Sequence, residues 1–98
     1  MELSISKEEN NLEITLKGRL DSNTSDEFDE ALSREMDEKT DKLIIDVTDI
    51  DFISSKGLRI LVKASKLLKD GKVIIRNPNN AVREVFRLSG LLKVFNIE

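Results

Sequence analysis

Few residues of this chain could take part in chemistry, and two adjacent serines, Ser54 and Ser55, stand out among them. The 98 residues include no histidine and no cysteine. The chain therefore has no imidazole base, no thiolate nucleophile, no disulfide and no zinc site of the Cys/His kind. No histidine is present to activate a serine, and the spacing of Asp21 and Asp46 does not identify an acid–base pair. We expect a protein that is not an enzyme and needs no metal and no cofactor.

The two serines lie in a segment, Asp49–Arg59, that leads from an apolar strand into a helix. Ligands of open α/β sheets tend to bind just beyond the carboxyl ends of strands, where loops feed the N-termini of helices. A plainer explanation is that one of the serines caps the helix, which is a common use of serine. Neither completes a capping box, because Gly57 and Leu58 are the residues three positions further on.

Gly57 is the second unusual residue of this segment. Glycine in the first turn of a helix costs up to about 1 kcal/mol relative to alanine. It therefore suggests that another group approaches the backbone there. The segment around Ser54, Ser55 and Gly57 is the candidate functional site.

A row of basic residues follows the serines on the same predicted helix. Its spacings of three and four place it on one helical face. Such a row is usually a solvated surface of modest energetic value. The functional interpretation is a rim that recognises an acidic partner, with electrostatics acting on association rate and specificity. The row consists of Lys56, Arg59, Lys63 and Lys66.

The rest of the chain supplies the elements that position this segment. Alternating apolar residues predict an N-terminal antiparallel hairpin, and apolar spacings of three and four predict helices. Gly18 indicates a bulge, and Gly71 and Gly90 stand where helices should end. The predicted elements are strands around Leu3–Ile5 and Leu12–Leu16, a helix over Thr24–Met36, a strand over Leu43–Val47, a helix over Lys56–Lys69, a strand over Val73–Ile75, a helix over Ala81–Ser89 and a strand over Val94–Ile97.

Local signals refine three of these elements. Thr24 followed by Glu27 fits a capping box at the start of the first helix, and Asn79 or Asn80 is available to cap the third. The apolar run Leu43–Val47 is rich in β-branched residues, which predicts a central strand covered on both faces. The apolar stripe of the second helix is too wide for one shallow contact, so this helix should pack deeply.

A hairpin followed by alternating helices and strands predicts an α/β fold, with a mixed sheet of about four to five strands packed against about three to four helices. The length suits one domain over residues 1–98. A net charge of −3 gives no global positive field for nucleic acid. No stretch approaches the roughly 18 apolar residues of a membrane span, and the N-terminus lacks the regions of a signal peptide. We expect no nucleic-acid partner, no membrane insertion and a cytoplasmic location.

Three blocks of the chain, taken in order, resemble the STAS domain family, and most closely its small bacterial anti-sigma factor antagonists. Gly18–Asp21 resembles the family's Gly-x-Leu/Ile-Asp element, and Phe52–Leu58 resembles its apolar-apolar-Asp-Ser-Ser/Ala/Thr-Gly-Leu segment. Val82–Leu91 resembles its last helix. One block would be weak evidence, but three in order over a chain of this length are specific. The resemblance covers essentially the whole chain and implies a single STAS domain.

The resemblance also implies a mechanism in which this chain performs no catalysis. Family members bind an anti-sigma factor that is also a serine kinase, which releases the sigma factor, and they are switched off when the kinase phosphorylates one serine. That serine falls on Ser55, and a PP2C-type phosphatase would act on the phosphorylated form. The resemblance implies that Asp21, Ser54, Ser55, Lys56 and Gly57 bind the partner, and the basic row adds Arg59 and Lys63 to the expected partner-binding residues.

Two positions depart from the family pattern. Ser54 stands where an aspartate usually precedes the phosphorylated serine, and Lys56 stands where a small residue follows it. Three consequences stay open: Lys56 stabilises a phosphate on Ser55 by ion pairing, it changes which partner is accepted, or phosphorylation has been lost. The alternative function is a constitutive STAS subunit that docks on another protein, such as the ATPase of an ABC-type lipid-transport system, without phosphorylation.

Overall fold

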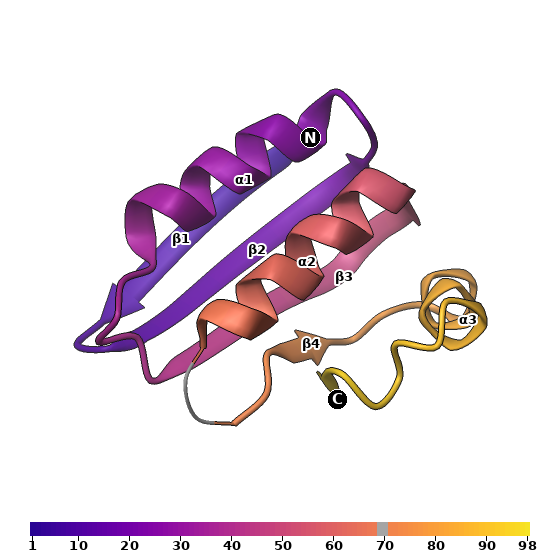
Figure 1. The fold of residues 1–98 in the computed structure, drawn as a ribbon. Coiled ribbons are helices and arrows are strands. Elements are labelled where there is room, and N and C mark those ends of the chain that lie inside the picture. The colour runs from indigo at the N-terminus through magenta and orange to yellow at the C-terminus, as the bar shows by residue number, and fades with distance from the viewer. Residues whose placement is uncertain (69–70) are drawn as a thin grey trace.

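The computed structural model describes residues 1–68 and 71–98. Figure 1 shows a sheet with helices α1 and α2 side by side on one face, and helix α3 set apart from this pair. No helix in these two ranges is long and apolar enough to cross a membrane. The elements in chain order are β1 (Glu2–Glu8), β2 (Asn11–Leu20), α1 (Thr24–Glu35), β3 (Lys42–Ile53), α2 (Ser55–Leu67), β4 (Ile74–Arg76), α3 (Asn80–Leu88) and β5 (Asn96–Ile97).

The strands form one mixed sheet in the order β1-β2-β3-β4-β5. β1 and β2 pair antiparallel, with Leu3 opposite Leu16, and the remaining neighbours pair parallel. The register between β2 and β3 shifts around Gly18, which has a φ of 104° and was the predicted bulge. The five-stranded sheet, the N-terminal hairpin and the three helices of the described residues confirm the predicted fold class.

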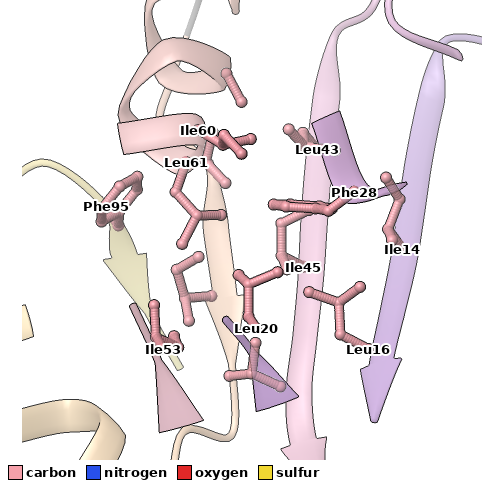
Figure 2. Packing of buried hydrophobic residues seen from close by; sticks show 14 of the residues in the cluster. Ile14, Leu16, Leu20, Phe28, Leu43, Ile45, Ile53, Ile60, Leu61 and Phe95 are labelled. Atoms are coloured by element: carbon pink, nitrogen blue, oxygen red, sulfur yellow. The ribbon is translucent and has the colours of Figure 1, made fainter. Parts of the chain in front are cut away.

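The core lies between the helices and the sheet face that they cover (Figure 2). Phe28 of α1 and Leu61 of α2 are fully buried and join the same cluster as Ile45 of β3. Phe86 of α3 packs edge to face on Phe95, with ring centroids 5.6 Å apart, and both belong to this cluster. Because burial of apolar surface is the main favourable term in folding, this core fixes the positions of β2 and β3, and with them the loops that follow.

Strand β3 is central in the sheet, but only one of its faces is fully buried in the described residues. In the run Leu43–Val47 the side chains alternate, and Ile44 and Asp46 are only half-buried. On this second face Arg76 Nη1 lies 3.0 Å from a carboxylate oxygen of Glu13 and 4.0 Å from one of Asp46. The prediction that β3 is covered on both faces is therefore wrong, since a set of charged side chains occupies one of them.

Helix α2 packs deeply, as predicted, but ends earlier than its glycine signal indicated. Leu61 is completely buried, whereas Leu67 is 54% exposed. The backbone turns extended at Leu68, with a ψ of 115°, and this residue is the C-cap. Gly71 has a φ of 81° but lies beyond that cap, so it does not end the helix. The predicted end at Lys69 lies outside the described residues.

Helix α3 begins and ends at two of its predicted signals. Asn79 Oδ1 accepts a hydrogen bond from the Val82 N–H at 2.8 Å, so Asn79 and not Asn80 is the cap. Gly90 has a φ of 71°, and its N–H donates to the carbonyl of Arg87 at 3.1 Å. These bonds satisfy backbone groups that a helix end leaves open.

Candidate functional site

Strands β2 and β3 end side by side, and the two loops that follow them form the candidate site. Leu20, the last residue of β2, is the register partner of Ile53, the last residue of β3. The Ser54 N–H donates to the Leu20 carbonyl at 2.8 Å. Asp21 and Ser54 therefore leave the sheet as neighbours, and α1 and α2 begin at the same edge (Figure 1). Two sequence blocks that lie far apart along the chain meet here.

The two serines at this edge have different surroundings. Ser54 is the N-cap of α2, and its Oγ accepts a hydrogen bond from the Gly57 N–H at 3.1 Å. Ser55 is the first residue of α2 and is exposed, and its hydroxyl makes no hydrogen bond within the described residues. Serine and aspartate are both strong N-cap residues, so Ser54 caps α2 as an aspartate would and brings one negative charge less.

The N-terminus of α2 has a positive end that no side chain of its first turn offsets. This turn contains no acidic residue. The Ser54 hydroxyl accepts a hydrogen bond from the Gly57 N–H, and the Ser54 carbonyl accepts one from the Leu58 N–H. The N–H groups of Ser55 and Lys56 have no acceptor in the described part of the chain. Unpaired amides and the helix dipole together favour an anion at such a position.

Gly57 is buried where α2 passes over the end of β2. A Cβ atom at this position would lie 2.9 Å from side-chain carbons of Leu20 and 3.3 Å from its carbonyl oxygen. The group that approaches this backbone is therefore the chain's own Leu20, which explains the glycine without a ligand. Gly57 affects the site indirectly, because its small size lets the start of α2, including Ser55, lie close to β2.

Asp21 is a neighbour of the serines, but its carboxylate is engaged at the start of α1. Its Oδ1 accepts hydrogen bonds from the N–H groups of Asn23 and Thr24, each at 2.9 Å. In return, Thr24 Oγ1 accepts from the Asp21 N–H at 2.9 Å. The predicted capping box of Thr24 with Glu27 is therefore wrong. The reciprocal pair is Asp21 with Thr24, because helical bonding already begins where the Ser25 N–H donates to the Asp21 carbonyl.

These hydrogen bonds lower the pKa of the Asp21 carboxyl below its ordinary value. The largest cause is the hydrogen bond from the Thr24 N–H, which favours the ionised form. Partial desolvation opposes this shift, while the Asn23 N–H, the Thr24 hydroxyl and the charge of Arg19 add to it. A carboxylate with a lowered pKa is a weak base, so Asp21 is poorly suited to activate a neighbouring hydroxyl.

The basic row on α2 divides into two pairs. Lys56 Nζ lies 2.6 Å from Asp26 Oδ1, and Lys63 Nζ lies 3.2 Å from Asp29 Oδ1, so both of these lysines tie α2 to α1. Lys56 Nζ also donates to the Ser22 carbonyl at 3.3 Å. No acidic partner lies within ion-pair distance of the other two members in the described residues. These two are Arg59 and Lys66.

A groove of about 610 Å³ runs along the other flank of α2. Ser55 stands at one end, and the apolar walls include Val62 and Leu67 of α2 and Leu91 from the segment after α3. Figure 1 shows α1 on one flank of α2 and the C-terminal part of the chain on the other. The sequence does not predict this groove, because Leu91 and α2 come together only through the packing of the C-terminal segment.

The sequence also does not predict an exposed cation–aromatic pair. The guanidinium carbon of Arg19 lies 4.3 Å from the ring centroid of Phe52, which is 39% exposed. The two residues are register partners on β2 and β3. Both belong to the sequence blocks that mark the site, but only the strand register shows that they stack.

The chemistry available at this site is that of an exposed hydroxyl beside unpaired amides. No group of three or more acidic, histidine or cysteine side chains could hold a metal ion in residues 1–68 and 71–98. Ser55 is the hydroxyl at the start of α2 that is not used in capping. This arrangement suits a hydroxyl on which another protein acts.

Comparisons with known proteins agree with the fold and with the sequence blocks. The STAS domain matches residues 2–98. BtrV of Bordetella bronchiseptica, a proposed anti-sigma factor antagonist, is 29% identical over 99 residues, which cover 99% of this chain and 85% of that protein.

Three solved structures are similar to this chain over nearly its full length. The unphosphorylated anti-sigma factor antagonist SpoIIAA has a TM-score of 0.86 at 22% identity, covering 99% of this chain and 88% of its own. The phosphorylated form of SpoIIAA from Bacillus has a TM-score of 0.76 at 21% identity, covering 99% and 91%. An anti-sigma factor antagonist of Mycobacterium paratuberculosis has a TM-score of 0.83 at 23% identity, covering 98% and 83%. With its family match, its sequence blocks and its fold in agreement, the chain belongs to the STAS domain family.

Proposed function

We propose that this protein is a cytoplasmic anti-sigma factor antagonist that works by partner switching. In its unphosphorylated form it binds an anti-sigma factor of the serine-kinase type, which releases a sigma factor. Phosphorylation of Ser55 ends that binding, and a PP2C-type phosphatase restores it. The single observation that carries the proposal is that Ser54 supplies the cap of α2 and leaves the exposed Ser55 hydroxyl without a structural role.

The transfer step requires nothing of this chain except an accessible oxygen. The Ser55 Oγ attacks the γ-phosphorus of ATP bound to the kinase, the hydroxyl proton passes to a base of the kinase, and ADP leaves. In the reverse direction, water attacks the phosphorus, the serine oxygen recovers a proton, and inorganic phosphate is released. The absence of histidine and cysteine from the chain fits this division of labour, because both catalysts are other proteins.

A phosphate on Ser55 is compatible with the fold and unfavourable for the interface. It adds about −1.5 to −2 charges at pH 7 and strongly hydrated oxygens. The unpaired amides at the start of α2 and the helix dipole favour that charge locally. The phosphorylated protein therefore stays folded but no longer binds a partner surface complementary to the unmodified site, as a reversible switch requires.

The relatives support the proposed class of protein, but they do not support the assignment of the switch to a particular residue. BtrV is named a proposed anti-sigma factor antagonist, and SpoIIAA has been solved in both an unphosphorylated and a phosphorylated form. At 22% and 21% identity these structures share the fold with the present chain. The assignment of the switch to Ser55 rests on the surroundings of Ser54 and Ser55 described above.

Phosphorylation by a candidate partner tests the proposal directly. The chain is incubated with ATP and the serine-kinase anti-sigma factor encoded beside its own gene, and the product is analysed by mass spectrometry. We expect one phosphate on the wild type and on Ser22→Ala, a change at an exposed serine of the neighbouring loop, and none on Ser55→Ala. Unmodified wild type, or unchanged modification of Ser55→Ala, would contradict the assignment.

Binding of the same partner gives the second measurement. Ser55→Glu should weaken binding at least about tenfold, which corresponds to about 1.4 kcal/mol. Ser33→Glu places the same charge on the exposed side of α1 and should leave binding unchanged. Equal affinities for wild type and Ser55→Glu would argue against a switch at this position.

A second candidate function is favoured by Lys56. This lysine stands where relatives carry a small residue, and Asp26 and the Ser22 carbonyl hold its ammonium group on the α1 side. A site with this fixed contact suits a constitutive STAS subunit that docks on the ATPase of an ABC-type lipid-transport system. Co-purification with such an ATPase, together with insensitivity to Ser55→Glu, would favour this function over partner switching.

A further inference from the structure

We infer that the groove along α2 binds an acidic segment of the partner that carries apolar side chains, and that a phosphate on Ser55 competes with this segment for Arg59. The inference rests on the proposed function, because the partner is the anti-sigma factor. Beyond that function, the inference specifies which kind of partner segment docks here and names Arg59 as the residue through which the phosphate acts.

The apolar walls of the groove come from α2 and from the segment after α3, and they remain partly or largely exposed in the described residues. Leu67 is 54% exposed, and Val62 and Leu91 are half-buried. Single exposed apolar residues are common on protein surfaces, but these three border one hollow of about 610 Å³. A hollow of this kind offers room for apolar anchors of a bound segment.

The charges around the groove specify the chemistry of its occupant. Arg59, Lys63 and Lys66 border it, and no acidic residue does. This is a locally basic surface on a chain with a net charge of −3. Lys63 is already paired with Asp29, which leaves Arg59 and Lys66 as the cations available to a partner. Complementary carboxylates would therefore be selected over basic or neutral segments.

The far end of the groove limits the length of this segment. Ser55 and Lys66 stand about 16 Å apart along α2 at about 1.5 Å per residue. Lys66 also borders a second hollow, which Asp37 and Glu38 line. Their carboxylates would repel an acidic chain that continued past Lys66. The occupant is therefore a short segment that lies between Ser55 and Lys66.

The position of Arg59 connects this groove to the switch. Ser55 and Arg59 are four residues apart on α2, so their side chains neighbour each other, and both border the groove. Arginine pairs strongly with phosphate through two parallel N–H donors. A phosphate on Ser55 would neutralise Arg59 and bring negative charge to the mouth of the groove. The acidic segment would then lose one cation and meet a like charge, without any change in the fold.

A zero-length cross-linker tests directly whether Lys66 contacts a carboxylate of the partner. A carbodiimide joins a lysine amine to a carboxylate in contact with it as an amide, and the lost water hydrates the carbodiimide to a urea. In the complex of the full chain with the anti-sigma factor, we expect Lys66 to be joined to an Asp or Glu of the partner. The link should disappear when Ser55 is phosphorylated. Cross-links only from lysines outside the groove, such as Lys42 at the start of β3, at the other end of the parallel strands, would overturn the inference.

Charge reversal provides the matched affinity measurement. Arg59→Glu/Lys66→Glu should weaken partner binding at least about tenfold, whereas Lys42→Glu should change it by less than about twofold. Thermal unfolding of each variant checks that it is folded, and the cross-link on the wild type stands independently if the double variant is not. Wild type that binds with the same affinity as the folded double variant contradicts this inference alone. Wild type that does not bind the partner contradicts the proposed function, and the inference with it.

Discussion

Helices α1 and α2 begin side by side at one edge of the sheet, yet their N-termini differ in the charge of the side chains around them. The start of α1 carries the carboxylate cap of Asp21 and two further acidic residues, Asp26 and Glu27, in its first turn. The start of α2 carries the neutral cap Ser54 and no acidic residue. Both helices have the same positive end from their peptide dipoles. Acidic side chains offset this positive end at α1, whereas the first turn of α2 contains none. Under the proposed function, the charge at α2 is that of a phosphate on Ser55.

The two starts also differ in how closely they approach the sheet. Gly57 in the first turn of α2 lies against Leu20 at the end of β2, where a Cβ would come within 2.9 Å of side-chain carbons. Lys56 in the same turn reaches across to Asp26 of α1 at 2.6 Å. The exposed hydroxyl of Ser55 therefore lies on a closely packed helix start and not on a loose loop.

Among substitutions at the two helix starts, Gly57→Ala should produce the largest loss of stability. The added methyl group meets a fully buried Leu20, and overpacking of this kind typically costs about 1–3 kcal/mol. The better helix propensity of alanine returns up to about 1 kcal/mol. We expect the free energy of unfolding to fall by about 1–2 kcal/mol, measured by chemical denaturation.

A double-mutant cycle with Leu20 identifies the cause of that loss. Leu20→Ala alone should cost about 2–5 kcal/mol, as core truncations do. In the Leu20→Ala variant the space beside Gly57 is open, so adding Gly57→Ala should leave the free energy of unfolding unchanged or raise it. An equal cost of Gly57→Ala in both backgrounds would show that contact with Leu20 is not the reason for the glycine.

Ser54→Ala and Ser55→Ala separate the two adjacent hydroxyls. Loss of the N-cap at Ser54 should reduce the free energy of unfolding by about 1 kcal/mol. The Ser55 hydroxyl makes no hydrogen bond in the described residues, so Ser55→Ala should stay within about 0.5 kcal/mol of the wild type. Denaturation of both variants under one condition checks this order. The reverse order would mean that Ser55 is the cap and would remove the main support for its role as the modified residue.

The sequence predicts much of this region because its signals are local. Two serines before an apolar helical stripe mark the start of α2, and Gly57 in the first turn indicates a close approach. The β-branched run predicts the first part of β3 over Leu43–Val47, but the strand continues to Ile53, through residues that were predicted to connect it to the helix. What the local signals leave open is which serine caps, because both are good caps and neither has a Glu or Gln three positions later.

Two features escape prediction for different reasons: one is decided by competition between neighbouring cap residues, and the other by a contact between distant strands. Thr24 with Glu27 fits a capping box in sequence, but Asp21 begins the helical bonding earlier and takes Thr24 as its own partner. The stacking of Arg19 on Phe52 requires the register of two parallel strands, which a bulge shifts. The residue pattern at the start of α1 offers both Asp21 and Thr24 as caps and does not decide between them. The register of two strands is not contained in the pattern of either strand alone.

Ser55→Glu and Asn23→Glu compare the two helix starts by adding the same charge to each. At α2 the new carboxylate meets unpaired amides and no acidic neighbour in the first turn, so it should stabilise the protein by about 0.3–1 kcal/mol. At α1 it joins Asp21, Asp26 and Glu27, so repulsion should cancel or reverse the gain. Thermal unfolding at low salt measures both variants, and equal stabilisation of the two would contradict the proposed difference between the helix starts.

The smallest effect concerns the pH dependence of the α1 cap. The folded protein holds the pKa of Asp21 below its ordinary value, chiefly through the Thr24 N–H. Since the unfolded chain then binds the proton more tightly, the stabilising contribution of this carboxylate is complete above the ordinary pKa of about 3.9. It is lost as the pH falls through the lowered pKa. Asp21→Asn should therefore be less stable than wild type at pH 7, and this difference should shrink in acid. An NMR titration of the carboxyl carbon checks the cause, because Asp21 titrating at or above its ordinary pKa would show that the cap does not form in solution.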